Sequence, residues 1–235
     1  MDDGITFTEP LAALPVVETR RWTRDNRWPE GIIDPDRYPE IAIARTDGEM
    51  EEVGRLRYAL FVERDGKRYA HADHTNKVFL EPIDKISLNF VARARDKCAV
   101  AVRATWAHDT IVDPHLEQVV AHADLAPEVL DTVIVHSRLV VRRSMSARGL
   151  LPVLFQSMFR GARMANARFC LAATRSELIP LFERFGFCQL DRRRPYFDEV
   201  AGWMNVLLLD LHDRERLTKS ESPFVAVYDE FDPRT

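Results

Sequence analysis

Arginine side chains are concentrated in the second half of this 235-residue chain, where they could bind phosphate or carboxylate groups. Residues 141 to 194 contain eleven arginines and no lysine against three acids, a local excess of +8 within a chain of formal net charge -4. A planar guanidinium pairs with phosphate and carboxylate oxygens through two parallel hydrogen bonds. This segment therefore predicts contact with a phosphate-bearing ligand or an acidic partner surface. The alternative is a solvated basic face that balances acids elsewhere.

The chain offers little for metal or thiol chemistry. Its best metal-like cluster is the run HADH at residues 71 to 74, which lies in a polar stretch typical of a loop and has no second ligand group at helical or hairpin spacing. Cys98, Cys170 and Cys188 are odd in number and widely spaced, which favours buried thiols over a disulfide framework or a zinc site. We therefore predict no metal site.

Composition and charge narrow the class of protein. An apolar content of 46% is ordinary for a protein with a sizeable core, and the net charge of -4 gives no reason to expect nucleic-acid binding by the whole surface. No run approaches the roughly 18 apolar residues that cross a bilayer. The first residues, MDDGITFTEP, carry acids where a signal peptide needs bases and an apolar core. We therefore expect a cytoplasmic protein with no membrane span.

Hydrophobic periodicity predicts an alternation of strands and helices that would position these side chains. Expected strands are 40–45, 89–94, 98–107, 131–141, 168–174, 187–190 and 202–212, and expected helices are 48–66, capped by Asp47, turns within 115–130, 149–166, with Pro152 in its first turn, and 178–185. This order indicates a mixed α/β sheet. The crossover through 149–166 is long enough to make strands 132–141 and 168–174 parallel, and we expect them to separate at one end.

Three regions are predicted along the chain. Residues 1–38 hold several prolines and many charges without sustained periodicity, and they read as an irregular arm. Residues 39–212 carry the α/β pattern and form the domain. Residues 213–235 add a short helical pattern and apolar residues, which we expect to pack on the domain as a tail.

The stretch "LIPLFERFGF" at 178–187 is a short helix with an apolar stripe, closed by Gly186 in the left-handed conformation. It resembles the L-Y-x-x-x-G-F helix of the GNAT superfamily of N-acyltransferases, and upstream "SRLVVRRSMSARGLLPVLF" resembles that family's strand, pyrophosphate loop and helix. The resemblance implies a GNAT-like mixed, mostly antiparallel central sheet, with helices on both faces and a V-shaped splay between two parallel strands.

The same resemblance implies a binding site for an acyl donor carried on phosphopantetheine. A strand edge would pair with the amides of the arm, and free N–H groups at a helix N-terminus would face the phosphate. The implied donor-binding residues are Leu139, Val140, Val141, Arg142, Arg143, Arg148, Gly149, Leu150 and Leu151. An apolar tunnel for the acyl tail is expected between the splayed strands, lined by Leu139, Phe155 and the apolar face of 203–211.

Two residues depart from the GNAT pattern. Leu151 and Val153 stand where small residues let the backbone approach a pyrophosphate, which disfavours coenzyme A relative to an acyl carrier protein. Phe182 stands where many members have a tyrosine that protonates the departing thiolate, and phenylalanine has no proton to give.

A narrower resemblance links residues 40 to 215 to the N-acyl amino acid synthases and acyl-homoserine-lactone synthases. It is carried by "RLRYALFVE", "PIDKISLNFVAR", "AVAVRATW" and "HSRLVV". The matching positions are Arg57, Phe61, Arg103, Ser137 and Arg138. We expect Arg57, Phe61, Arg103 and Arg138 to bind the acceptor, with Arg103 and Arg138 clamping its carboxylate. The alternative is that these two arginines hold the sheet to helix 48–63 through ion pairs.

His136 and Ser137 are the predicted catalytic residues. Where those synthases have a glutamate three residues before the strand arginine, this chain has Val135, with His136 next to it. Histidine titrates near neutrality and could accept the amine proton. The alternative is a packed or surface histidine, since neighbouring residues of a strand point to opposite faces.

The two resemblances imply an N-acyltransferase that moves a medium or long acyl group to the amine of an amino acid or similar small acceptor. The expected co-substrate is an acyl-phosphopantetheine thioester on acyl carrier protein, the expected partner, or on coenzyme A, with no permanently bound cofactor. Two alternatives stay open: a conventional acetyl-coenzyme A N-acetyltransferase, and a non-catalytic GNAT-like binding module.

Overall fold

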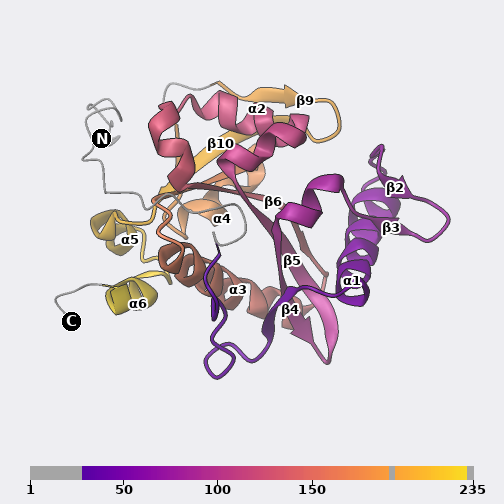
Figure 1. Ribbon diagram of the computed structural model, residues 1–235, viewed down its shortest axis with the longest axis horizontal. Coiled ribbons are helices and arrows are strands. Elements are labelled where there is room, and N and C mark those ends of the chain that lie inside the picture. Colours follow the sequence, from indigo (N-terminus) through magenta and orange to yellow (C-terminus); the bar gives the residue numbers. More distant parts are fainter. Residues whose placement is uncertain (1–27, 191–193, 232–235) are drawn as a thin grey trace.

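A mixed eight-stranded sheet forms the centre of the computed structural model, which describes residues 28–190 and 194–231 (Figure 1). In spatial order the strands are β1 (Ile41–Ala44), β4 (Leu88–Ala94), β5 (Lys97–Trp106), β6 (Val133–Val141), β7 (Phe169–Thr174), β10 (Gly202–Asp210) and β8 (Cys188–Gln189), and β9 (Tyr196–Asp198) pairs with β10. Among the described strands of this sheet, β6 and β7 are the parallel pair and the other pairs are antiparallel. The predicted fold class is confirmed.

The parallel strands β6 and β7 separate partway along their length. Their pairing runs from Val133 with Phe169 to His136 with Ala172, although β6 continues to Val141 and β7 to Thr174. Beyond His136 the β7 side of β6 therefore lacks a β7 partner. This is the expected splay.

A bulge in β6 coincides with the splay. Ala101 opposes Val140 but Arg103 opposes Ser137, so β6 carries one extra residue at this point. Arg138 lies within it at a φ of 54°, a conformation that residues other than glycine seldom adopt. A bulge re-aims the side chains next to it. As a result the neighbours Ser137 and Arg138 both contact the group of charged residues around Arg103.

Alternate residues of the strands face two different apolar layers. On β6, Ile134 belongs to the cluster packed under α3, whereas Val133 and Val135 belong to the cluster under α2. A third cluster, around Val140, lies under α1. Because side chains of a strand alternate between the two faces of a sheet, both faces need a helical cover.

Helices supply that cover on both faces (Figure 1). They are α1 (Asp47–Arg57), α2 (Pro114–Ala123), α3 (Met145–Met164), α4 (Ile179–Glu183), α5 (Arg214–Lys219) and α6 (Val225–Tyr228). A π-helix, η3 (Tyr58–Arg64), follows α1, and the 3-10 helices are η4 (Pro82–Ile86), η5 (Ala107–Val112), η6 (Pro127–Thr132), η7 (Ser176–Leu178) and η8 (Asp229–Phe231). The apolar layer under α3 also takes side chains from α4, α5 and α6.

The first predicted helix differs from the structure at both ends. Thr46, not Asp47, is the N-cap, and it forms a capping box with Glu49. The helix changes to a π-helix, η3, from Tyr58 onward. The polar stretch after it contains a small hairpin, β2 (Ala72–Asp73) with β3 (Val78–Phe79), that periodicity did not predict.

Helix α3 begins earlier than predicted. The Ser144 hydroxyl caps it by accepting the Ala147 N–H, so the helix starts at Met145. Arg148, which precedes the predicted helix 149–166, is therefore helical, and Pro152 lies in the helix interior rather than in its first turn. Ala147 and Leu151 pack into the core, which explains why the helical pattern extends this far back.

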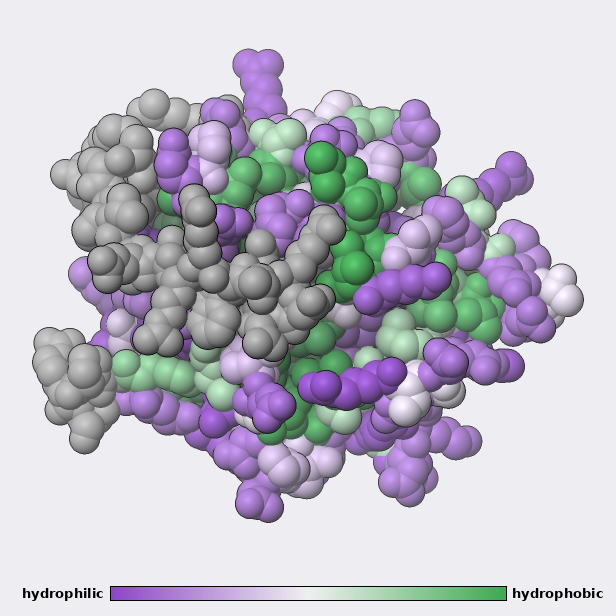
Figure 2. All heavy atoms as spheres, viewed as in Figure 1, coloured by the Kyte–Doolittle hydropathy of each residue, from purple (hydrophilic) through white to green (hydrophobic). Residues whose placement is uncertain are grey.

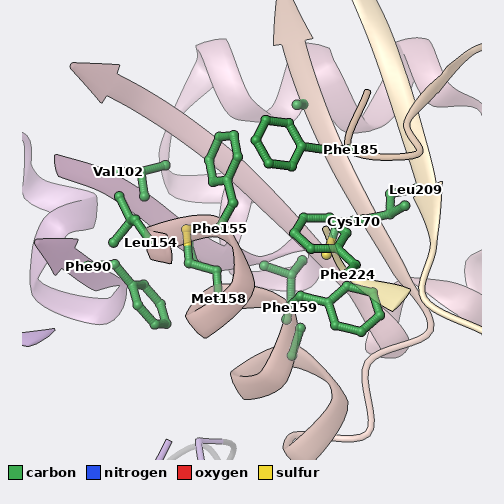
Figure 3. Packing of buried hydrophobic residues seen from close by; sticks show 14 of the residues in the cluster. Phe90, Val102, Leu154, Phe155, Met158, Phe159, Cys170, Phe185, Leu209 and Phe224 are labelled. Carbon is green, nitrogen blue, oxygen red and sulfur yellow. The ribbon is translucent and has the colours of Figure 1, made fainter. Parts of the chain in front are cut away.

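The stretch at 178–187 folds as predicted at its C-terminal end. Gly186 has a φ of 94°, and the Phe187 N–H returns to the Phe182 carbonyl. Phe182, Phe185 and Phe187 all enter the core, where Phe185 packs on Phe155 at a centroid distance of 4.7 Å (Figure 3).

Both ends of the described chain pack on the domain. Ile32 and Tyr38, near the end of the predicted arm, are buried, while residues 1–27 of that arm lie outside the described residues. In the tail, the ring of Phe224 stacks on Phe159 at 4.7 Å. No helix in the described ranges is both long and apolar enough to cross a membrane.

In one view the surface is mostly hydrophilic, with apolar side chains in a central band (Figure 2). The large apolar side chains exposed anywhere on the described surface are Ile86, Ile111, Val112, Leu178, Phe197 and Trp203.

Candidate active site

A cavity of about 220 Å³ lies at the splay between β6 and β7. Side chains from both faces of the sheet line it, including Leu116 of α2 on one face and Phe155 of α3 and Phe182 of α4 on the other. The strands contribute Leu139 and Thr174. The cavity therefore lies where the strands part and has walls from both faces of the sheet.

Both predicted catalytic residues, His136 and Ser137, line this cavity. Burial lowers the pKa of His136 to about 4, and its Nε2 atom is buried without a hydrogen-bond partner among the described residues. His136 is therefore a neutral imidazole at neutral pH that holds a proton poorly. The Ser137 hydroxyl accepts a hydrogen bond of 3.0 Å from Arg103 Nε, which leaves its own proton free to be donated.

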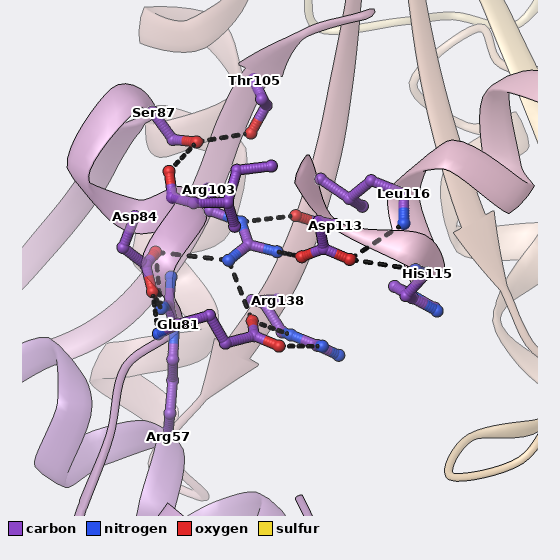
Figure 4. Close-up of polar contacts among 12 residues, drawn as sticks. Arg57, Glu81, Asp84, Ser87, Arg103, Thr105, Asp113, His115, Leu116 and Arg138 are labelled. Carbon is purple, nitrogen blue, oxygen red and sulfur yellow. Dashed lines mark hydrogen bonds and ion pairs between the residues drawn. The ribbon is translucent and has the colours of Figure 1, made fainter. Parts of the chain in front are cut away.

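The predicted acceptor arginines come together in one buried network (Figure 4). Arg57 and Arg103 are both 0% exposed. Arg57 Nη1 donates to both oxygens of Asp84 at 2.9 Å. Arg103 Nη1 donates to Glu81 at 2.9 Å, and Arg103 Nη2 lies 3.5 Å from Asp113.

Arg138 completes this network with two hydrogen bonds to Glu81, of 2.7 Å from Nε and 2.6 Å from Nη2. Three arginines thus face three carboxylates, and their charges balance. Burial alone would raise the pKa of Glu81, but hydrogen bonding and attraction to Arg138, followed by attraction to Arg103 and Arg57, lower it to about 2. Glu81 is therefore a carboxylate at neutral pH, shared between Arg103 and Arg138.

Only two of the four predicted acceptor residues face the cavity. Phe61 and Arg138 line the cavity, whereas Arg57 and Arg103 lie behind it with their charges paired. The guanidinium of Arg138 also lies over the ring of Tyr69, 4.8 Å from its centroid. Its Nη1 atom makes no hydrogen bond among the described residues, so Arg138 retains a donor for a ligand.

The predicted donor residues lie along the end of β6 and the start of α3. Leu139 lines the cavity, while Val140 points into the core under α1. Arg142, Arg143 and Arg148 are exposed, and Arg142 Nε donates to the Cys98 carbonyl at 2.9 Å. The predicted phosphate-binding loop is thus confined to the residues between β6 and Ser144, because the segment that follows is helical.

The apolar part of the cavity matches the predicted acyl tunnel in position. Leu139 and Phe155 line it, and Met204 is the residue of β10 that reaches it. Phe182, at the position where many GNAT members have a tyrosine, adds an aromatic ring to the cavity wall. Its ring cannot protonate a leaving group.

Several residues of the cavity and its network were not predicted. Glu81 connects Arg103 and Arg138 although it is 22 residues or more from either in sequence. Lys67 and Arg175 add positive charge to the cavity wall, and His115 lines it from the start of α2. The sequence did contain one sign of Glu81's position. Acids at 81 and 84 have the spacing of a capping box, and in the structure the Asp84 carboxylate accepts the Glu81 backbone N–H at the start of η4.

No group of three or more histidine, cysteine or acidic side chains in the described ranges is placed to hold a metal ion. The run at 71 to 74 lies in the β2–β3 hairpin, where His74 Nδ1 is 2.9 Å from the Tyr58 hydroxyl.

The mostly antiparallel sheet and the splayed parallel pair, with a cavity between those strands, define a GNAT-like fold. The model of the N-acyl amino acid synthase FeeM family matches residues 52–207, about two thirds of the chain. The chain therefore belongs to this family. Since the family is one of acyltransferases, the non-catalytic alternative loses support.

Solved structures share the fold at low sequence identity. The CoA-dependent acyl-homoserine lactone synthase BjaI, solved with MTA, is 16% identical over 78% of this chain and 92% of its own, with a TM-score of 0.58. The acyl-homoserine lactone synthase LasI is 14% identical over 73% of this chain and 89% of its own, with a TM-score of 0.58.

FeeM, an N-acyl amino acid synthase from uncultured soil microbes, is 12% identical over 77% of this chain and 96% of its own, with a TM-score of 0.53. No significant match was found among curated proteins.

Proposed function

We propose that this acyltransferase moves a medium or long acyl group from a phosphopantetheine thioester to the amine of an amino acid or similar small acceptor. The observation that carries the proposal is the cavity at the splay, which is apolar where α3 and α4 line it and charged where Arg138, Lys67 and Arg175 line it. An acyl chain and a carboxylate-bearing amine need these two environments next to each other.

The free edge of β6 would bind the arm of the donor. Beyond His136 the backbone of β6 has no β7 partner, so its N–H and C=O groups on that side can pair with the amides of phosphopantetheine. The phosphate would then lie near the start of α3, where helix N–H groups and the exposed Arg142, Arg143 and Arg148 favour negative charge.

The charged part of the cavity would bind the acceptor. Arg138 would donate from Nη1 to the acceptor carboxylate, with Phe61 packing beside it. Arg103 would act indirectly, by holding the Ser137 hydroxyl and the Glu81 carboxylate that orients Arg138. Arg57 would act one step further away, through Asp84, which lies between Arg57 and Arg103. Ser137 would donate its hydroxyl proton to the departing thiolate, since Phe182 cannot.

The choice between acyl carrier protein and coenzyme A now depends on surface charge. Leu151 and Val153 lie inside α3, so they no longer argue against a diphosphate in the preceding loop. The exposed arginines at the start of α3 still favour an acidic carrier-protein surface. We propose acyl carrier protein as the preferred donor, with coenzyme A thioesters as the weaker one.

Two experiments test this function. Mass spectrometry of lipids from cells that overproduce the protein should show an N-acylated amino acid, and its absence under all acceptor conditions would contradict the proposal. Kinetics with one acyl chain on both carriers should give a higher kcat/KM for the carrier-protein thioester. A kcat/KM for the coenzyme A thioester at or above that value would overturn the choice of donor.

A conventional acetyl-coenzyme A N-acetyltransferase is the second candidate. The cavity volume of about 220 Å³ lies below the roughly 300–1,000 Å³ of most small-molecule pockets, which favours a short acyl group. A series of acyl chain lengths on one carrier distinguishes the two candidates, because kcat/KM should rise with chain length in the first and fall in the second.

A further inference from the structure

The ammonium group of the acceptor must lose a proton before the amine can attack, and His136 is poorly suited to accept that proton. An amino acid carries an ammonium group at neutral pH, and amide formation requires the neutral amine. The buried imidazole of His136, with a pKa lowered to about 4, has little tendency to hold a proton there. A base near the operating pH works better.

A second histidine lines the same cavity. His115 lies in the first turn of α2, and its Nδ1 atom is 2.6 Å from Oδ2 of Asp198 in β9. The histidine side chain is 19% exposed and the aspartate side chain 12% exposed, so the pair is sheltered but reachable from the cavity. Neither residue was singled out by the sequence.

Asp198 is held as an anion in a fixed orientation. Its Oδ1 accepts the backbone N–H groups of Val200 and Ala201, while Oδ2 faces His115. Burial opposes ionisation, but hydrogen bonds from His115, Ala201 and Val200 outweigh it and hold the pKa of Asp198 well below its usual range. An acceptor-only carboxylate at Nδ1 requires the proton on Nδ1.

That tautomer leaves Nε2 of His115 as a lone-pair acceptor. No described residue hydrogen-bonds to Nε2, and this atom is not sealed off as Nε2 of His136 is. The backbone N–H of His115 is fixed too, because the α2 cap Asp113 accepts it at 3.0 Å. Asp113 also lies against Arg103, so the charged network that places Arg138 also places the start of α2.

We propose that His115 is the general base of acyl transfer in this protein, and that Asp198 is the residue that positions its imidazole. The inference rests on the proposed function and names the proton acceptor within the same cavity. Charged groups around this pair are Asp113 on its own helix, Arg103 and Arg138 from β5 and β6, and Lys67 after η3.

The step balances as follows. Nε2 of His115 takes a proton from the acceptor ammonium and passes it to solvent, and the neutral amine attacks the thioester carbonyl to form the N–C bond. As this bond forms, Nε2 takes the second amine proton. The C–S bond then breaks, and the thiolate leaves as a thiol with the Ser137 hydroxyl proton. Ser137 regains a proton from solvent while the imidazolium gives its proton back to solvent. The products are one amide and one free thiol, and no oxidant or metal is needed.

The test compares His115→Asn and Asp198→Asn with the wild-type enzyme in acyl-transfer kinetics across pH. His115→Asn should lower kcat/KM on the order of 10²-fold or more and remove the acidic limb of the pH profile. Asp198→Asn should cause a smaller loss, because asparagine can still accept the N–H groups of residues 200 and 201 but turns an N–H toward Nδ1 and so favours the wrong tautomer.

His122→Asn is the matched control. His122 is seven residues further along α2 and packs on Tyr196 of β9 at a centroid distance of 5.2 Å, but it does not line the cavity. Its kcat/KM and pH profile should match wild type. Thermal unfolding of all three variants separates loss of fold from loss of chemistry, and added imidazole should partly restore a His115→Ala variant.

The outcomes are distinguishable. Wild-type protein that transfers no acyl group to any amine would overturn the proposed function and the inference with it. An active wild type with an unchanged pH profile in a folded His115→Asn variant would overturn the inference alone. Equal losses for an amino acid and for hydroxylamine, which is uncharged at the assay pH, would assign His115 a structural role instead.

Discussion

At the scale of single residues, the buried arginine network shows how one side-chain type can serve two purposes. Arg57 and Arg103 match positions that the family resemblance assigned to the acceptor, yet both are fully buried and paired with acids. Arg138 has the same type of partner but reaches the cavity. Burying a charge is expensive unless it is paired and hydrogen-bonded, so the network must remain complete for any of its members to hold its place.

Replacing Glu81 with glutamine should therefore destabilise the protein strongly. Arg103 and Arg138 would lose their shared carboxylate, and breaking a buried pair typically costs about 3–5 kcal/mol. Urea unfolding at neutral pH measures this change. Glu51→Gln is the control, because its pair with Arg55 is exposed and should matter by less than about 1 kcal/mol. Equal effects of the two substitutions would contradict the importance of the network.

The lowered pKa of Glu81 predicts that the stability of the fold decreases in acid. The folded-state pKa of Glu81, about 2, lies below its ordinary value of 4.5, so its contribution to stability is present above pH 4.5 and is lost as the pH falls toward 2. The contribution is on the order of 3 kcal/mol. The free energy of unfolding should fall less steeply over this range in Glu81→Gln than in wild type, and parallel curves would rule out the pairing.

At the scale of elements, the ends of helices decide where the proposed donor site would lie. The Ser144 cap starts α3 one turn before the predicted arginine-glycine pair, and Gly186 ends the α4 segment with a positive φ. Gly149, the glycine of that pair, and Gly186 differ in the backbone conformation that they must adopt. Gly149 is inside a helix with open space around it, whereas Gly186 needs a conformation that side chains disfavour.

Alanine at the two positions should therefore act in opposite directions. Gly186→Ala forces a φ of 94° on alanine and brings its Cβ within 2.6 Å of a Leu217 methyl, so we expect a loss of about 1–2 kcal/mol or more. Gly149→Ala should stabilise α3 by about 1 kcal/mol. Chemical unfolding of both variants measures the difference. A stabilised Gly186→Ala would be inconsistent with the closure seen in the structure.

The exposed arginines near the start of α3 should attract the donor by a charge interaction that salt weakens. Glutamate at Arg142, Arg143 and Arg148 should weaken donor binding strongly at low salt and less at high salt, because exposed charges are screened over about 8–10 Å at physiological ionic strength. Titration calorimetry at two salt concentrations measures this. Arg55→Glu, an exposed arginine on α1, should leave affinity unchanged. Unchanged affinity in all three reversals would assign the basic surface another role.

At the scale of the whole molecule, the chain closes its core with segments that lie outside the family match. The family model ends at residue 207, but Leu217, Phe224 and Val227 belong to the apolar layer under α3. Phe224 is 2% exposed and contacts Phe159 and Phe185. The tail is therefore part of the fold's stability rather than an appendage.

Phe224→Ala should destabilise the whole domain by about 3–5 kcal/mol, because it leaves a cavity between two other rings. The thermal midpoint should fall by several degrees or more. Val225→Ala, at a half-buried neighbouring position, should cost much less. A small effect at Phe224 would mean that the tail is only loosely attached.

The sequence by itself determined the elements and much of their order. Period-2 and helical patterns, turn residues and the closing Gly186 depend on local chemistry, which acts within a few residues and can be read directly. The crossover between strands 132–141 and 168–174 required a parallel pair, and the structure has that pair. The family resemblance then placed His136, Ser137, Arg138 and Leu139 together, and all four line the cavity.

Only the tertiary structure decided which charges are paired and which face the cavity. Glu81 meets Arg138 across 57 residues of sequence, and His115 meets Asp198 across 83. Neither pairing leaves a local pattern, because ion pairs between distant elements depend on how the sheet twists and where a bulge turns a side chain. The bulge at Arg138 brought Ser137 and Arg138 to the same charged group, which alternation along a regular strand would have kept apart.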